Sequence, residues 1–287
     1  LNLFYDFSMT TTTLLSTFYH QPLPWLAIAL AIFGAFTMGF ARSGIGSGGF
    51  VVSPLLVLAL GGTDGLAVTA VLMLPASFMG AWQHRKDSIA NITKPMLPAA
   101  ILGTVIGGLI LWRLVTSGEL SVVHYRIEIL VSIMSLAYII LISFRNQIAN
   151  RFKLKGTPSN TKLFGLGALV GISQTVVNSG TPLMTVFFLC YRITKEKFVG
   201  AQLMVLLAQN IFKLLPFVLL GILHFENATA AALLLPLTFL GSLLGNIFYE
   251  KASEKTFFGL YVVLLFIGFV ASALLLVGRE SILRLII

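Results

Sequence analysis

The chain has 287 residues, of which 57% are hydrophobic and only 10% are charged, and its mean hydropathy is +0.95. A soluble domain carries about 25% charged residues, so this composition excludes an ordinary cytosolic enzyme, a disordered protein and a disulfide scaffold. The formal charge of +9 fits basic loops beside anionic membrane lipid, and we expect no nucleic-acid partner. What remains is an all-α, polytopic integral membrane protein.

Long apolar runs, bounded by charges, prolines and glycines, predict the membrane helices, because a span needs about 20 residues. We expect helices at 24–41, 65–83, 95–112, 126–144, 163–177, 198–221, 228–249 and 257–277. Two further apolar segments, 50–60 and 182–191, are too short to cross a hydrocarbon core of about 30 Å. Each follows a break rich in glycine, serine or asparagine, so we pair each with the preceding helix as a hairpin, re-entrant or fully crossing.

The two halves of the chain share a pattern of leucine, proline and glycine. The sequence Leu97-Pro98-x3-Leu102-Gly103-x3-Gly107 recurs without gaps as Leu235-Pro236-x3-Leu240-Gly241-x3-Gly245. Upstream of it, Gly39, Ser47 and Gly48 recur as Gly171, Ser179 and Gly180. Each half then holds one broken hairpin plus three transmembrane helices, so the second half starts on the opposite side of the membrane. The sequence therefore predicts two inverted-topology repeats, a common transporter architecture.

Basic residues give the expected topology and the domain boundaries. With the basic linker 146–161 in the cytoplasm, 13 of the 19 lysines and arginines are cytoplasmic and four are external, as the positive-inside rule requires. The expected divisions are an external N-terminal segment 1–22, repeat 1 at 23–145, the cytoplasmic linker, repeat 2 at 162–278 and a C-terminal tail 279–287. Both termini are then external.

The two breaks carry residues that suit an anion site. Thr181-Pro182 reads as an N-cap followed by proline at the first helical position, so a half-helix begins near the membrane midplane in each half. Free N–H groups and the positive end of the helix dipole attract anions there. The alternative is that glycine and serine serve only tight helix packing. The candidate substrate-binding residues at the breaks are Ser47, Gly48, Gly49, Asn178, Ser179, Gly180 and Thr181.

Two cations fall inside predicted membrane segments. Lys213 lies in the middle of a helix, where a charge costs about 2.5–3.5 kcal/mol, so we expect it to offset the charge of an anionic substrate. Gln209 and Asn210 are candidates for the same cavity, and Arg42 lies beside the first break. Alternatively, Lys213 bonds carbonyls freed by Pro216, and Arg42 only reaches the headgroups. All ten acids fall in loops or at helix ends, which favours a uniporter or coupling through Lys213 over a carboxylate relay.

The glycine and serine tip in each half, the pattern at Leu97–Gly107 with its copy, and the basic central linker resemble the TauE/SafE family of sulfite and organosulfonate exporters. The likeness covers roughly residues 24–278. It implies a bacterial inner-membrane permease, built from two related halves, that moves a small sulfur-containing or organic anion. With the midplane site, it points to alternating access.

Other functions stay open at this point. An intramembrane enzyme could use Ser47 or Ser179 with Lys213 as a Ser–Lys pair, and a transporter could carry a different small metabolite. A scaffold would not need two broken hairpins, and a cation channel would want carbonyl or acidic rings. Cys190 and the scattered histidines give no metal-ligand spacing, so we expect no metal and no cofactor. A homodimer is left open.

Overall fold

The computed structural model describes residues 24–45, 48–86, 90–154 and 156–277. Within these ranges every regular element is a helix, in the order α2 (Pro24–Ile45), α3 (Gly49–Leu60), α4 (Gly62–Gln83), α5 (Ala90–Thr116), α6 (Leu120–Ser143), α7 (Arg145–Phe152), α8 (Asn160–Val177), α9 (Thr181–Cys190), α10 (Lys195–Phe212), α11 (Leu214–Leu219), α12 (Phe225–Lys251) and α13 (Glu254–Val277). Six spans in the described ranges are long and apolar enough to cross a membrane. The chain is a multi-pass, all-α membrane protein.

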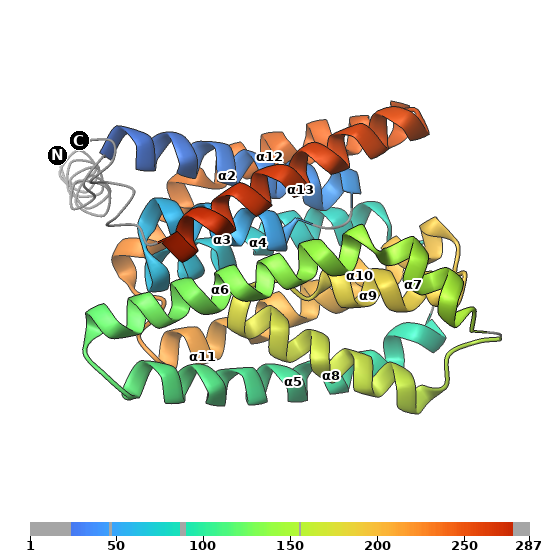
Figure 1. Cartoon of the computed structure of the whole chain (residues 1–287), viewed down its shortest axis with the longest axis horizontal. Helices are drawn as coiled ribbons and strands as arrows, with labels where there is room; N and C mark the ends of the chain where they lie inside the picture. The colour runs from blue at the N-terminus through green and yellow to red at the C-terminus, as the bar shows by residue number, and fades with distance from the viewer. Residues whose placement is uncertain (1–23, 46–47, 87–89, 155, 278–287) are drawn as a thin grey trace, which may run out of the picture.

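The helices run lengthwise through one bundle (Figure 1). In this view α2, α4, α6, α9 and α12 run from left to right, and α3, α5, α8, α10 and α13 run from right to left. Each helix from α8 onward therefore runs opposite to its counterpart in the first half, in the order expected of inverted halves. The repeat boundaries stay a prediction.

Both short helices lie where the sequence predicts them. α3 has 12 residues and α9 has 10, and each begins after a break that follows a longer helix. In Figure 1, α3 extends leftward and α9 extends rightward from the middle of the bundle. The amino ends of these two helices therefore lie in the interior, and almost every residue of α3 is buried.

The two halves are interlocked by close packing between glycine-bearing helices. α5 packs along α8, and α12 packs along α2, so each long helix lies against the first helix of the other half. A methyl group on Gly103 would collide with the carbonyl oxygen of Ala168, and one on Gly241 would collide with that of Phe36. The repeated G-x3-G pattern thus lets backbones approach closely, as small residues do in membrane helix pairs.

Two elements differ from the sequence expectation. The predicted helix 198–221 is divided, because α10 ends at Phe212 and α11 begins at Leu214. Pro216 explains the division, since it has no N–H to donate to the carbonyl of residue 212. The predicted linker contains the short helix α7, in which no side chain is buried.

Candidate functional site

The second hairpin turns at residues 178–180, here called the second tip. Hydrogen bonds with side chains of α8 fix the conformation of this tip. Asn178 ends α8 in the left-handed conformation, with φ 57° and ψ 25°, which asparagine tolerates better than most residues. The Gly180 N–H donates to Gln174 Oε1 at 2.9 Å, and the Ser173 hydroxyl donates to the Ser179 carbonyl. Tyr138 on α6 hydrogen-bonds to Ser173 in turn. The tip is therefore fixed from both α8 and α6.

The first tip, of which the structure describes Gly48 and Gly49, meets the second tip inside the bundle. Gly49 opens α3, and a methyl group there would collide with the carbonyl oxygen of Asn178. Only glycine allows this contact. Gly48 and Gly49 are buried, as are all residues from Asn178 to Thr181. Neither α3 nor α9 has a side-chain cap in the part of the chain that the structure describes, and Gly180, rather than the predicted Thr181, is the N-cap of α9. In the first turn of α3 the Val51 N–H donates to the Gly48 carbonyl.

Lys213 binds directly to the second tip. Its ammonium donates to Asn178 Oδ1 at 2.6 Å and contacts Met73 Sδ at 3.3 Å. The other half of the Asn178 amide donates to the carbonyl of Leu66 on α4, at 2.8 Å. Lys213 has no exposed surface, and its side chain bonds neither a freed carbonyl near Pro216 nor the membrane surface. A buried cation therefore lies on the second tip, at the residue between α10 and α11.

A buried polar network continues from the tip into α4 and α10. Gln174 Nε2 donates to Asn210 Oδ1 at 3.0 Å, and Asn210 Nδ2 donates to Ser77 Oγ at 2.6 Å. Gln174 also contacts Met73 Sδ at 3.2 Å, so Met73 touches both Gln174 and Lys213. These bonds fix the relative positions of α4, α8 and α10 around the tip.

Arg42 is a second buried cation. It lies in the last turn of α2, 1% exposed, and its Nε, Nη1 and Nη2 atoms have no hydrogen-bond partner among the described residues. The residue before it, Ala41, packs against Gly48 of the first tip. In the same described ranges neither cation forms an ion pair with a carboxylate. Lys213 on the second tip and Arg42 in the helix that leads to the first tip are therefore both buried without a protein counter-charge.

The structure brings most of the predicted site residues together. Asn178 contacts both Lys213 and Gly49. Asn210 and Gly180 both hydrogen-bond to Gln174. Ser179 Oγ and both polar atoms of the Gln209 amide are buried without a partner in the described ranges. Thr181 is buried as the first residue of α9, and Gly48 packs against Ala41. Ser47 lies outside the described residues.

Sequence reasoning missed Gln174, Ser173, Met73, Ser77 and Tyr138. Gln174 carried a usable signal, because it precedes Asn178 by four residues and so shares its helix face. Met73 and Ser77 are likewise one turn apart on α4. Nothing local marks Met73 or Tyr138, which join the site only through contacts between distant helices.

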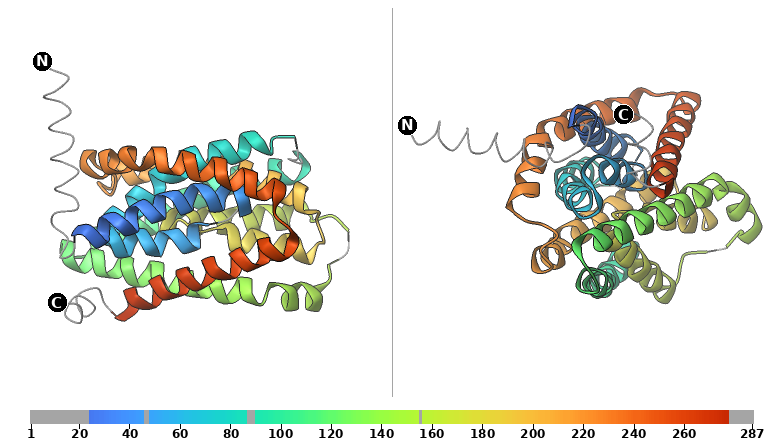
Figure 2. Two further views of the ribbon diagram at one scale, coloured as in Figure 1. Left: turned by 90° about the horizontal axis from the view of Figure 1, so that it is seen from above. Right: turned by 60° about the vertical axis from the view of Figure 1, so that its left-hand side comes forward.

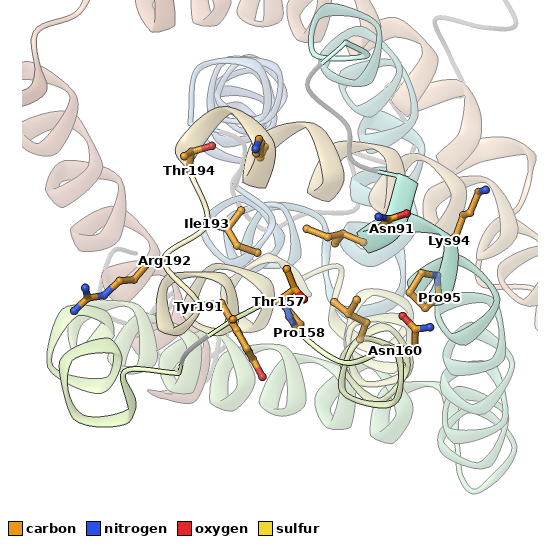
Figure 3. Close-up of a pocket in the computed structure, with 14 residues that line it drawn as sticks. Asn91, Lys94, Pro95, Thr157, Pro158, Asn160, Tyr191, Arg192, Ile193 and Thr194 are labelled. Carbon is orange, nitrogen blue, oxygen red and sulfur yellow. The ribbon is translucent and has the colours of Figure 1, made fainter.

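A separate cavity of about 640 Å³ opens at the end of the bundle where α5, α8 and α10 begin (Figure 3). Three of its lining residues are cations, Lys94, Arg192 and Lys197. Lys94 and Arg192 lie at opposite sides in Figure 3. Ile92 and Leu163 also line it, and they belong to a buried apolar cluster that reaches Val170, against which Gly180 packs. The cluster thus separates this cavity from the second tip.

Residues 28–272 of the chain match the family model described as "Sulfite exporter TauE/SafE". The chain belongs to the TauE/SafE family. The match includes both tips and both buried cations, and the family is one of exporter-type membrane transporters. Searches among curated proteins and among solved structures gave no match.

Proposed function

We propose that this TauE/SafE protein exports a small sulfur-containing or organic anion, such as sulfite or an organosulfonate, by alternating access around the tips. The observation that carries the proposal is a pair of buried cations without a counter-charge: Lys213 bonds the second tip, and Arg42 follows Ala41, which packs against the first tip. Buried charges are normally paired, because desolvation of an unpaired ion costs several kcal/mol. A bound anion would supply the missing charge.

The residues around the tips would have different roles in anion binding. Lys213 and Arg42 would attract the anion, Ser179 Oγ would donate to its oxygens, and the positive ends of the dipoles of α3 and α9 would favour its charge. Asn178 would hold Lys213 in place until the anion arrives. Such binding uses no carboxylate and no cofactor.

Release requires the hairpins to move, since the site residues are buried in this structure. On the side of the 640 Å³ cavity, the apolar cluster that contains Leu163 and Val170 would have to part. We assign this end to the cytoplasm, because α6 is followed there by the basic linker and α4 is followed there by Arg85 and Lys86. The cavity would then be the entrance for an exported anion, in a protein of the inner membrane with both termini outside.

The geometry gives no support to a Ser179–Lys213 pair; Ser47, the other serine considered, lies outside the described residues. Lys213 Nζ bonds Asn178 Oδ1 rather than a serine, and Ser179 Oγ has no partner in the described part of the chain. A hydroxyl that is to act as a nucleophile needs its base within hydrogen-bond reach.

Replacing Lys213 by methionine tests the proposal. Anion binding should weaken by about 2–5 kcal/mol, the cost of removing one partner of a buried, hydrogen-bonded charge pair. The unliganded protein should stay folded, because an apolar side chain in place of a buried ion is often neutral or stabilising. The measurement is the thermal shift of the purified protein with sulfite, sulfonates, sulfate and carboxylates, since a ligand raises the stability of the state it binds.

Lys251→Met is the matched control, because Lys251 is an exposed lysine at the end of α12. It should leave every shift unchanged. If Lys213→Met responds to anions as the wild type does, Lys213 is not in the site. If no anion shifts the wild-type protein, the proposed function is wrong.

A further inference from the structure

We infer that the tip site prefers a doubly charged oxyanion to a singly charged one, an inference that rests on the proposed function. Two buried charges lead to it. Arg42 and Lys213 are both almost completely buried, and each comes from a different half. Ala41, the residue before Arg42, packs against Gly48 of the first tip, and Gly49 of that tip contacts Asn178, which bonds Lys213. No carboxylate in the described ranges is ion-paired with either of them.

Charge balance distinguishes the two kinds of anion. Inside a protein the energy between charges is many times larger than in water, so the repulsion between two buried cations is large. A dianion neutralises both cations. A monoanion neutralises one and leaves a net positive charge in the interior, which is costly unless it is paired. The same site should therefore hold the dianion more tightly.

The free donors also match a compact oxyanion. The Arg42 guanidinium has all three nitrogens unpartnered within the described residues, and its planar fork can bind two oxygens of one group. Lys213 has three N–H donors, of which two point to Asn178 Oδ1 and Met73 Sδ, so one is left for a ligand. Ser179 Oγ and the Gln209 amide add uncharged donors. Sulfite, thiosulfate and sulfate carry the charge and oxygens that this set would satisfy.

The test compares thiosulfate, a dianion near neutral pH, with methanesulfonate, a monoanion under the same conditions, by calorimetric titration of the purified full chain. Thiosulfate should bind the wild type more than about tenfold tighter than methanesulfonate. Arg42→Gln should lose most of this preference, because one of the two charges is gone. Arg42→Lys keeps the charge and should keep the preference, although its affinities fall with the loss of the fork.

Arg113→Gln serves as the charge-matched control, because Arg113 lies at the far end of α5, beside Trp112. It should leave the ratio of the two affinities unchanged. Equal binding of both anions by the wild type overturns the dianion preference and leaves the proposed anion transport standing. Binding of neither anion sinks both. If Arg42→Gln does not fold, the wild-type ratio and Arg42→Lys decide.

Discussion

Asn178 is the residue on which both tips depend. Its backbone ends α8, its carbonyl oxygen faces Gly49, and its side chain joins Lys213 to Leu66. An aspartate here would pair with Lys213 and neutralise it. The amide orients the ammonium without cancelling its charge, and so leaves that charge available to a ligand.

Ser179 in the second tip and Ser173 on α8 are expected to have different roles, the first in anion binding and the second in stability. Ser179 Oγ has no partner in the described ranges, so Ser179→Ala should leave thermal stability unchanged and should weaken anion binding by about 1.5–3 kcal/mol. Ser173 Oγ bonds the tip itself, so Ser173→Ala should lower the melting temperature. Both quantities come from thermal unfolding with and without sulfite. Loss of stability in Ser179→Ala, with unchanged binding, would assign that serine to packing alone.

The site could be predicted from sequence only as far as single residues stand out. Lys213 and Arg42 stand out because a charge inside a long apolar segment is expensive, and Asn178 stands out because it interrupts a helix. Gln174, Met73 and Ser77 do not, since polar and sulfur-containing side chains are ordinary in helices. Their membership follows from the packing of α8, α4 and α10 against one another.

At the scale of elements, the reliable signals were the lengths of the apolar segments and the glycine-, serine- or asparagine-rich breaks between them. They predicted both short helices, because segments of 10–12 residues after a glycine or asparagine cannot cross the membrane alone. They did not predict the division between α10 and α11. A single proline can bend, break or merely tilt a helix, and the surrounding packing decides which.

Two glycines on α8 allow a matched test of the close packing between α5 and α8. A Cβ at Gly171 would collide with the carbonyl of Ala100, whereas a Cβ at Gly165 would meet nothing within 4 Å. Gly171→Ala should destabilise the protein by about 1–3 kcal/mol, the usual cost of overpacking. Gly165→Ala should be neutral or stabilising by up to about 1 kcal/mol, because alanine favours a helix over glycine. Thermal unfolding in detergent measures both, and equal effects would contradict the packing described for α5 and α8.

At the scale of the whole molecule, α4, α6, α9 and α12 end, and α5, α8, α10 and α13 begin, at one end of the bundle (Figure 2). The connections between these helices are the ones that the distribution of lysine and arginine assigned to the cytoplasm. The alternating direction of the long helices could be predicted from sequence, because each crossing reverses the chain, whereas the short helices α7 and α11 were not predicted. Which helix touches which could not, since hydropathy records depth in the membrane and not the identity of the neighbour.

Reporter fusions test the sidedness. A reporter inserted at Gly156 should read as cytoplasmic, and one at the C-terminus should read as external, because an odd number of crossings separates the two positions. Gly156 is a suitable site, since a side chain there would meet nothing within 4 Å. Both reporters on one side of the membrane would refute the inverted arrangement.

The pairing of α2 with α12 has a consequence for how the protein is made. α2 is made well before α12, the helix that packs along its glycine-bearing surface. Until α12 is made, the Thr238 hydroxyl that reaches the Ala35 carbonyl is missing. A chain cut short before α12 would therefore leave the surface of α2 without the helix that packs along it.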